Sequence, residues 1–320
     1  MCWRPSGSAE VKHPFALGLT AAALATASWG IQLPLAKDAF ATVDPFHITS
    51  LRYLIASLFL LAALIWREGW QSLSYRGSAL RAPALGVIGM CGSPMLVFLG
   101  MSMSSAEHAV VIVALQPAIA ALAFWLLRGR RPPNFTLACI AVAFFGVVLV
   151  VTRGALTFIE SPRQLLGDFI CLLGAACWVA YTLGTGRLAG WSIWRITTLT
   201  MLPGALASAL LTATLVTLGY LSIPSLGQLA AVGWEIAYLT FVGVLFALLA
   251  WNFGTRHIGP MNATLLINCM PVTTFIYRAA QGYQVAPIEV AGASLVVIAL
   301  IANNLRLRSQ QLHAARLAAT

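Results

Sequence analysis

The sequence places one arginine deep inside a long apolar stretch. Arg52 lies about eight residues, or ~12 Å at 1.5 Å per residue, into the helix predicted over residues 44–66. A charge at that depth costs roughly 2.5–3.5 kcal/mol on insertion scales, so we expect it to face protein or water rather than lipid. Two roles stay open. The guanidinium could bond backbone carbonyls or a hydroxyl of a neighbouring helix, or it could bind the carboxylate of a substrate.

Two tryptophans stand at matching places in the two halves of the chain, each beside a hydrogen-bonding group. Trp178 and Tyr181 lie at i and i+3 on one helix face, and Trp29 and Gln32 repeat this spacing 149 residues earlier. Such faces can simply pack helices together. They can also line a cavity, where the rings would stack on a substrate or hold a cation. We expect them to line a cavity.

Further polar and aromatic residues inside apolar segments complete the set of candidate substrate-binding residues. These are His108, Gln116, Trp251, Asn252, Asn262 and Asn268. His108 and Asn262 are related by a shift of 154 residues, and Gln116 lies about 80° around the helix from His108, so both could border one cavity. For Asn252 and Asn268, hydrogen bonding between helices is the alternative to ligand binding, and for His108 the alternative is a structural role with its hydrogen bonds satisfied.

The sequence does not gather groups for catalysis or metal binding. All nine acidic residues lie in loops, in tails or near the ends of apolar segments, and the six cysteines form no C-x-x-C pair. We therefore predict no catalytic residue, no metal site, no cofactor and no enzyme activity. Without an acid near the midplane, we expect facilitated diffusion or coupling through His108 rather than a carboxylate relay. Arg278, near a helix end, is expected to reach the membrane surface.

Two prolines lie inside apolar helices at matching positions. Pro117 and Pro271 are 154 residues apart, and the same shift relates Gly100 to Gly254. Proline removes one N–H and clashes with the carbonyl four residues back, so each predicts a kink in its helix. The kinks could be hinges that open the two mouths of a cavity, or fixed features of the packing. The matches indicate two halves of similar plan.

The composition is typical of a membrane protein. Hydrophobic residues make up 60% of the 320 residues and charged residues 9%, against about 25% charged residues in soluble domains. Apolar segments of around 20 residues can each cross about 30 Å of hydrocarbon as a helix. They predict an all-α integral membrane protein with ten transmembrane helices. The segments are 14–36, 44–66, 82–102, 106–127, 134–152, 166–187, 195–218, 229–253, 260–281 and 285–305.

The distribution of Lys and Arg predicts the orientation. With the N-terminus in the cytoplasm, 14 of these 19 residues fall on the cytoplasmic side, three fall on the opposite side and two lie within spans. Both termini are therefore expected to be cytoplasmic. Five spans per half would place the second half upside down, giving two inverted five-helix repeats with a substrate site near the midplane. The net charge of +10 then indicates contact with anionic lipids on the cytoplasmic side, and no nucleic acid.

Three stretches resemble the EamA-type transporters of the drug/metabolite transporter superfamily. They are Ser28-Trp29-Gly30 with Leu33-Pro34 and Lys37, then Arg52-Tyr53-Leu54, and finally Trp251-Asn252-Phe253-Gly254 with Gly259-Pro260 and Asn268-Cys269-Met270-Pro271-Val272. The resemblance covers residues 14 to 305 and implies a ten-helix carrier with a central cavity that exports small metabolites or drugs. Members often have a glutamate thirteen residues after each helix proline. This chain has Arg130 and Gln284 there, so the role of that acid does not carry over.

The resemblance implies a cytoplasmic tail (1–13), a first repeat (14–152), a linker (153–165), a second repeat (166–305) and a cytoplasmic tail (306–320). The tryptophan-rich inner helices are similar to those of aromatic amino-acid exporters, so we expect export of amino acids or other amphipathic zwitterions by alternating access. Export of amphipathic organic cations or drugs is one alternative, and a non-transporting receptor or assembly subunit is another. We expect a monomer or weak homo-oligomer in a bacterial inner membrane.

Overall fold

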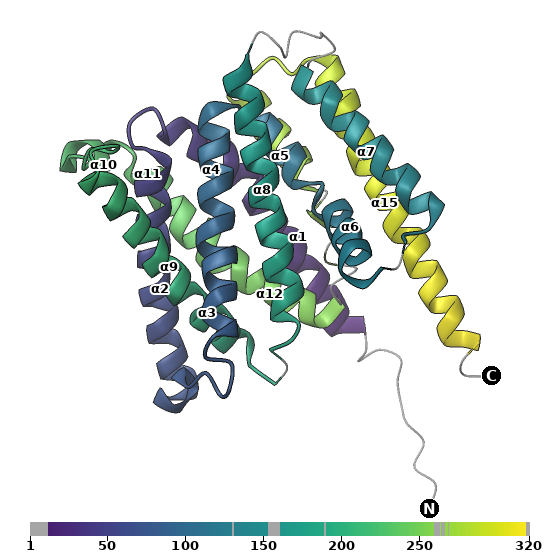
Figure 1. Ribbon diagram of the computed structural model, residues 1–320, viewed down its shortest axis with the longest axis horizontal. Coiled ribbons are helices and arrows are strands. Elements are labelled where there is room, and N and C mark those ends of the chain that lie inside the picture. The colour runs from purple at the N-terminus through teal and green to yellow at the C-terminus, as the bar shows by residue number, and fades with distance from the viewer. Residues whose placement is uncertain are drawn as a thin grey trace, which may run out of the picture.

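The protein is a bundle of long helices (Figure 1). The computed structural model describes residues 12–129, 131–152, 161–188, 190–258, 263, 266–267 and 269–317, and every regular element in this part of the chain is helical. Seven helical stretches are long and apolar enough to cross a membrane, judged by length and composition. They are Phe15–Ala39, Pro45–Glu68, Arg81–Met103, Ala106–Ala123, Pro162–Thr185, Ile193–Thr217 and Gly233–Ile258.

Two shorter apolar helical stretches, Asn134–Val150 and Pro287–Asn303, accompany these seven. The expected span over 260–281 falls partly outside the described residues. The prediction of an all-helical membrane protein is therefore confirmed for the described part of the chain, and the number ten stays a prediction.

The helices follow the chain in two series. The first contains α1 (Lys12–Ala39), α2 (Pro45–Glu68), η1 (Trp70–Leu73), α3 (Arg81–Gly86), η2 (Val87–Gly92), α4 (Ser93–Met103), α5 (Ala106–Val113), α6 (Gln116–Arg128) and α7 (Asn134–Thr152). The second contains α8 (Pro162–Thr185), α9 (Ile193–Thr217), α10 (Leu226–Ala231), α11 (Gly233–Ala237), η4 (Tyr238–Phe246), α12 (Ala247–Ile258), α14 (Cys269–Ala280) and α15 (Pro287–Leu317).

Helix α1 begins and α15 ends at the same end of the bundle, which we call the terminal end (Figure 1). We call the opposite end the far end. Polar caps set where helices start there. Asp44 accepts hydrogen bonds from the backbone N–H groups of Phe46 and His47 at 2.9 and 3.0 Å, and Pro45 occupies the first turn of α2. Such caps satisfy backbone donors that a helix start leaves unpaired, so they fix the level at which each helix enters the bundle.

Glycines bring helices of the two series into close contact. A Cβ added at Gly167 of α8 would lie 2.5 Å from the carbonyl oxygen of Gly100 in α4, and one added at Gly254 of α12 would lie 2.8 Å from that of Gly18 in α1. The two contacts are related through the repeat, because a shift of 154 takes Gly100 to Gly254 and a shift of 149 takes Gly18 to Gly167. Small residues allow this backbone approach in membrane bundles. The α4–α8 and α1–α12 pairs are therefore built alike.

A third close contact joins α7 to α15. The carbonyl oxygen of Gly146 would lie 2.6 Å from a Cβ at Gly292, and that of Gly292 would lie 2.5 Å from a Cβ at Gly146. These two helices run side by side along one edge of the bundle (Figure 1).

Two π-helical stretches also match between the series. Under the shift of 154, Val87–Gly92 falls within Tyr238–Phe246, and Gly89 falls on Gly243. A side chain at Gly89 would run into Tyr181, and one at Gly243 would run into Gln32. Those two partners are themselves related by the shift of 149. Since π-turns cluster at functional sites, this symmetry draws attention to the region between α1, η2, α8 and η4.

The helix that was expected to kink at Pro117 is interrupted just before this residue. The segment consists of two helices, with a turn at Ala114 and Leu115, and Pro117 lies in the first turn of α6. Proline is favoured there because the missing N–H belongs to a helix start, where that donor would have no intrahelical partner. Pro271 is the third residue of α14, and residue 268 before that helix lies outside the described residues.

Candidate functional site

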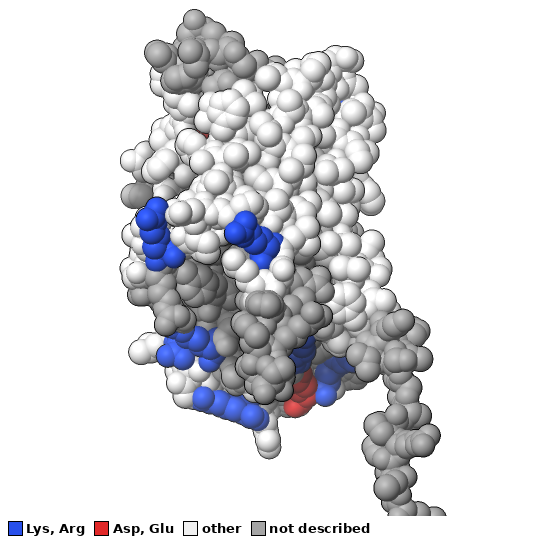
Figure 2. All heavy atoms as spheres, turned by 90° about the vertical axis from the view of Figure 1, so that its right-hand side faces the viewer, with Lys and Arg blue, Asp and Glu red and all other residues white. Residues whose placement is uncertain are grey.

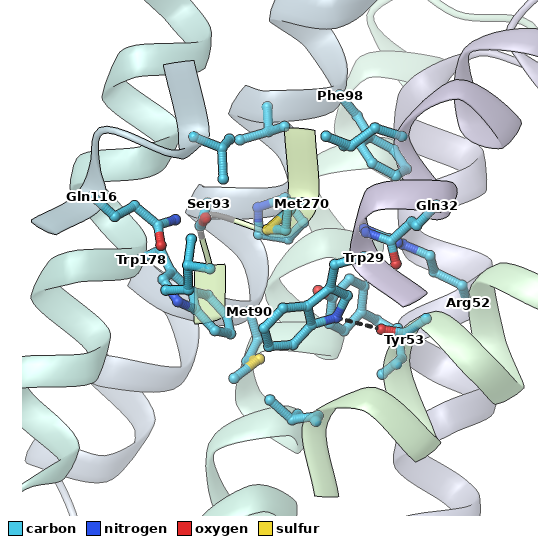
Figure 3. Close-up of a pocket in the computed structure, with 18 residues that line it drawn as sticks. Trp29, Gln32, Arg52, Tyr53, Met90, Ser93, Phe98, Gln116, Trp178 and Met270 are labelled. Carbon is cyan, nitrogen blue, oxygen red and sulfur yellow. Dashed lines mark hydrogen bonds between the residues drawn. The ribbon is translucent and has the colours of Figure 1, made fainter. Parts of the chain in front are cut away.

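A cavity of about 100 Å³ lies inside the bundle (Figure 3). It is surrounded by residues of α1, α2, η2, α4, α5, α6, α8, η4, α12 and α14. Its lining comes from both series of helices. The lining residues are Trp29, Gln32, Leu33, Arg52, Tyr53, Met90, Ser93, Pro94, Val97, Phe98, Val113, Gln116, Trp178, Gly243, Val244, Leu248, Ile267 and Met270. Five of the predicted substrate-binding residues line this cavity: Trp29, Gln32, Arg52, Gln116 and Trp178. Whether they bind a substrate stays a prediction.

The two equivalent tryptophans form an aromatic wall of the cavity (Figure 3). The rings of Trp29 and Trp178 meet edge to face, with centroids 5.7 Å apart, within the 4.5–7 Å range of favourable aromatic pairs. Trp29 also donates a hydrogen bond from Nε1 to the carbonyl oxygen of Gly243 at 2.9 Å. This bond ties the ring to the π-helical stretch η4 and fixes the direction in which it faces.

Trp251 and Tyr181 stand outside the cavity lining and support this wall. The Trp251 ring lies 5.5 Å from that of Trp29, and the Tyr181 ring lies 5.3 Å from that of Trp178. Both side chains are buried. The structure therefore brings all four predicted aromatic residues together, two on the cavity surface and two behind it.

Arg52 reaches the cavity from α2 and is 1% exposed. Its guanidinium carbon lies 4.1 Å from the centre of the Phe98 ring and 4.8 Å from that of Tyr53. Within the described part of the chain, its Nε and Nη1 atoms have no hydrogen-bond partner and it forms no ion pair. Among the described residues, the faces of Phe98 and Tyr53 stabilise this charge, and two donors remain for a ligand.

Gln32 lies beside Arg52 at the cavity (Figure 3). The Oε1 atom of Gln32 is buried and has no hydrogen-bond partner within the described residues. An unsatisfied buried acceptor costs about 1–3 kcal/mol. The cavity thus offers an unpaired cationic donor and an unpaired neutral acceptor close to the aromatic wall.

Asn252 does not belong to the described lining of the cavity. Asn252 donates a hydrogen bond from Nδ2 to Thr197 Oγ1 at 2.8 Å, which joins α12 to α9. For Asn252 this is the bonding between helices that the sequence left open as the alternative. Asn262 and Asn268 lie outside the described residues.

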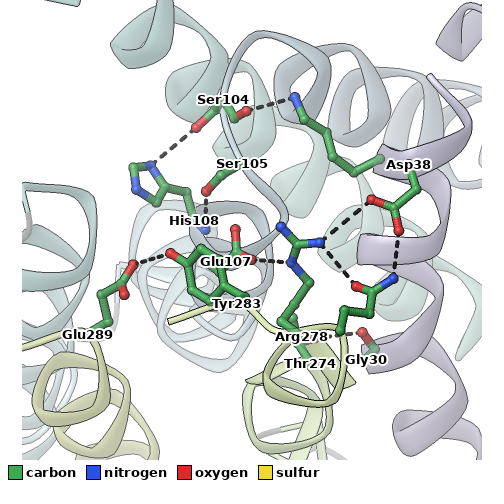
Figure 4. A network of polar contacts seen from close by, with 12 residues as sticks. Gly30, Asp38, Ser104, Ser105, Glu107, His108, Thr274, Arg278, Tyr283 and Glu289 are labelled. Atoms are coloured by element: carbon green, nitrogen blue, oxygen red, sulfur yellow. Dashed lines mark hydrogen bonds and ion pairs between the residues drawn. The ribbon is translucent and has the colours of Figure 1, made fainter. Parts of the chain in front are cut away.

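His108 is absent from the cavity lining and lies at the far end, where Figure 4 shows it beside Ser104. Its Nδ1 atom is 3.1 Å from Asp168 Oδ2, and the two side chains are 5% and 9% exposed. Ser104 donates a hydrogen bond to the same carboxylate, and Gln164 Nε2 lies 3.4 Å from His108 Nδ1. The sequence correctly placed Asp168 near a helix end but did not indicate that it is buried against His108.

The expectation that Arg278 reaches the membrane surface is wrong. Arg278 donates a hydrogen bond from Nε to Glu107 at 2.7 Å, and its Nη1 lies 3.6 Å from Asp38 (Figure 4). The Glu107 carboxylate is buried, with 3% of its side chain exposed. Since a buried carboxylate is stable only when it is paired, the guanidinium turns inward to meet it instead of extending to the surface.

Lys37 forms a third link at the far end. Its Nζ donates hydrogen bonds to the carbonyl oxygens of Met101, Ser102 and Ser104 at 2.7, 3.1 and 2.8 Å. These carbonyls belong to the end of α4 and to the turn after it, where an unpaired set of acceptors carries partial negative charge. All three ammonium protons are used, so the end of α1 is fastened to the end of α4.

Several cavity residues escaped the sequence reasoning. Met90, Ser93 and Phe98 belong to the η2–α4 segment, whose residues are apolar or small and show no helical face that differs from the rest. Tyr53 could have been noted because it follows Arg52 directly. Phe98 could not, because its contact with Arg52 depends on how α2 and α4 pack.

Comparison with known proteins agrees with this architecture. A family model described as the EamA-like transporter family matches residues 16–152 and 165–305. The uncharacterized transporter YrdR of Bacillus subtilis (strain 168) is 32% identical over 298 residues, covering 92% of this chain and 93% of YrdR. The uncharacterized transporter YyaM of the same organism is 29% identical over 273 residues, covering 85% of this chain and 88% of YyaM.

Two further comparisons show more distant similarity. The uncharacterized inner membrane transporter YedA of Escherichia coli (strain K12) is 25% identical over 290 residues, covering 85% of this chain and 86% of YedA. A solved crystal structure that is 20% identical superposes with a TM-score of 0.66, covering 94% of this chain and 99% of the other.

Proposed function

Because the chain belongs to the EamA-like transporter family, we propose that it is a secondary transporter that exports amino acids through its central cavity. The favoured substrates are aromatic or other amphipathic zwitterions, moved by alternating access. The protein would lie in a bacterial inner membrane as ten helices in two inverted five-helix repeats, with both termini in the cytoplasm.

The matched contacts of the two helix series support the inverted repeat. The Gly18–Gly254 and Gly100–Gly167 contacts, and the paired π-helical stretches, exchange with each other under the two repeat shifts. A carrier built this way can open one side by the same movement that closes the other. The cavity lies where residues of both series meet, as expected for a substrate site of this kind.

The proposed substrate class rests on the surroundings of Arg52. A buried guanidinium with two unpaired donors and no acidic partner in the described chain suits an anionic group with two acceptor oxygens. The substrate carboxylate would bind Arg52, and its ammonium would donate to Gln32 Oε1. The substrate side chain would then lie against Trp29 and Trp178, where aromatic contact favours a flat apolar group.

The same charge argues against organic cations as the main substrates. A cation in this cavity would meet the Arg52 charge at short range, in a site where few solvent dipoles screen the repulsion. The cavity of about 100 Å³ is also well below the ~300–1,000 Å³ of sites that bury drug-sized ligands. A small zwitterion fits both observations better.

Counterflow in proteoliposomes tests this function. Vesicles containing the purified protein are loaded with one unlabelled amino acid, and uptake of the same radiolabelled compound is measured across the amino acids and a set of quaternary ammonium ions. We expect counterflow of phenylalanine, tryptophan or other apolar amino acids, and none of the quaternary ions. Exchange of the quaternary ions alone would overturn the substrate class, and no exchange of any compound would favour a receptor.

A further inference from the structure

Helix α5 begins at the far end of the bundle, where Figure 4 shows Glu107 and His108 of its first turn. All eight residues of α5 are buried, and Ala109 and Val110 are fully inaccessible. Ser105 caps the helix by accepting a hydrogen bond from the backbone N–H of His108 at 3.1 Å. Val113, at the other end of this short helix, lines the cavity, so a passage from the cavity to the far end would run along α5.

Consecutive side chains in the first turn of α5 hold it in two directions. Glu107 binds Arg278 of α14, and His108 binds Asp168 of α8. The helix α8 is itself fastened to α4 by the Gly100–Gly167 contact. Helix α5 therefore bridges α14 on one side and the α4–α8 pair on the other.

The two links respond differently to pH. Arginine stays protonated at any physiological pH, so the Arg278–Glu107 link is permanent. Histidine changes its charge between about pH 5 and 8. Within the described residues, His108 is the only group in ion-pair contact with Asp168. The net charge of this buried pair therefore depends on one proton.

The other charged and titratable groups around α5 mostly contact partners outside the His108–Asp168 pair. From α1, Lys37 is bonded to three carbonyls and Asp38 to Gln281, with Arg278 nearby. From α5 and α14, Glu107 pairs with Arg278, and Tyr277 lies on the same helix as Arg278. From α8, Arg163 is exposed and Cys171 is buried against the Val97 carbonyl. At the start of α15, Glu289 accepts hydrogen bonds from Tyr283 and from the backbone of Ala286.

We propose that His108 and Asp168 form a proton-binding pair that holds the far end of the cavity closed, so that a rise in pH favours opening there. With the imidazole protonated, an imidazolium faces a carboxylate across 3.1 Å. When the proton leaves to water, the buried carboxylate keeps hydrogen bonds but loses its counter-charge, which disfavours the closed arrangement. The inference rests on the proposed function only in taking this end as a mouth of the transport pathway.

The test follows accessibility, so it needs no substrate. A cysteine introduced as Ala109→Cys, in full-length protein in lipid nanodiscs, is exposed to a maleimide from pH 6 to pH 8. Its labelling is read from its own peptide by mass spectrometry, which separates it from the native cysteines. A second protein with Ser222→Cys, in an exposed loop at the same end, corrects for the pH dependence of thiol reactivity. Ala106→Cys, at a position that is 1% exposed, serves as a second reporter.

We expect the corrected labelling of residue 109 to rise several-fold between pH 6 and pH 8. With His108→Gln the buried carboxylate lacks a counter-charge at every pH, so labelling should be high and independent of pH. With Asp168→Asn no carboxylate is left to lose its counter-charge, so the rise between pH 6 and pH 8 should disappear. The matched control is His47→Gln, because His47 pairs with Asp44 at 2.5 Å at the start of α2 and joins no two helices. That variant should keep the pH dependence.

An unchanged pH profile in both the His108→Gln and Asp168→Asn proteins would overturn the proposal, as would labelling that never rises in the parent. Failure of this proposal can be distinguished from failure of the proposed substrate class. Labelling that behaves as expected in a protein without amino-acid counterflow would leave the proton-binding pair in place and remove the substrate class. Counterflow with pH-independent labelling would do the reverse.

Discussion

Arg52 holds a positive charge in the interior with no acid in ion-pair contact in the described part of the chain. A charge buried without a partner destabilises a protein, and replacing it by a neutral residue can be neutral or stabilising. If Arg52 served the fold by bonding between helices, its loss would instead lower stability. Stability and transport therefore separate the two roles that the sequence left open.

Replacing Arg52 with Gln should weaken binding of amino acids without lowering thermal stability. A hydrogen bond to a charged group contributes about 1.5–3 kcal/mol, so KM should rise roughly 10- to 100-fold. Proteoliposome uptake gives KM, and tryptophan fluorescence gives the Tm. Arg67→Gln on the exposed end of the same helix should change neither. Normal KM with a lowered Tm in Arg52→Gln would instead assign Arg52 a structural role.

The aromatic wall leads to a second prediction at this scale. Trp29→Ala or Trp178→Ala should reduce transport about fivefold, because one aromatic contact contributes on the order of 1 kcal/mol beyond area burial. Trp70→Ala is the control, since Trp70 is 73% exposed in η1. Initial uptake rates at equal expression measure the effect. Normal rates in both wall variants would remove these rings from the substrate site.

Cavity-lining residues could be predicted from the sequence where they stand at equivalent positions of its two halves. Trp29 and Trp178 stand at equivalent positions and both reach the cavity. The His108–Asp168 contact could not be predicted, because 60 residues separate the partners and the pairing depends on how α5 meets α8. The sequence has no acid near the midplane, which argued against a carboxylate that takes part in proton transfer. Asp168 was expected near a helix end, and nothing in the sequence shows that an acid there is buried.

At the scale of helices, the glycine contacts set how closely the paired elements approach. Gly167→Val should lower the Tm by destabilising the protein by about 1–3 kcal/mol, the usual cost of overpacking, since the added carbons would meet the Gly100 backbone. Gly18→Val should act likewise in the α1–α12 pair. Gly186→Ala is the control, because its nearest neighbour would lie at an ordinary 3.6 Å. Thermal unfolding in detergent measures all three, and an unchanged Tm in Gly167→Val would contradict this role.

The two prolines give a prediction about movement. Pro117→Ala would restore an N–H at the break between α5 and α6 and favour one continuous helix there. Pro271→Ala should act at the start of α14. If these are hinges, cysteine labelling at the far end and at the terminal end should shift in opposite directions for the two variants, because the repeats are inverted. Unchanged labelling with normal transport would leave both prolines as fixed structural features.

The sequence predicts where helices lie better than it predicts their continuity. The apolar run 82–102 marks the right stretch, but α3, η2 and α4 divide it into a helix, a π-helical stretch and a second helix. A hydropathy profile does not show where an α-helix changes into a π-helix, because the side chains stay apolar throughout. The break before α6 was signalled by Pro117, yet its residue positions depend on where the backbone turns at Ala114 and Leu115.

At the scale of the whole molecule, repeats and charge are the features that sequence can reveal. Glycine and proline matches at fixed shifts indicated two similar halves, and the matched helix contacts agree with that plan. On the face that Figure 2 shows, the visible Lys and Arg side chains lie from about mid-height downward, toward the terminal end. Orientation in a membrane depends on this asymmetry and on the bilayer, which the fold alone does not include.

Reporter fusions therefore test the topology directly. With ten spans and cytoplasmic termini, fusions at Gly69, Gly129, Gly190 and the C-terminus should report the cytoplasm, and fusions at Asp44, Glu160 and Pro224 should report the outside. The reason is the count of 14 against three Lys and Arg residues, together with an odd number of spans per half. Alkaline phosphatase and a fluorescent protein, active on opposite sides of the membrane, give the two readings. Gly129 and Glu160 flank the fifth predicted span, so the same side for both would show that 134–152 does not cross. The second half would then have the same orientation as the first, and the inverted repeat would be lost.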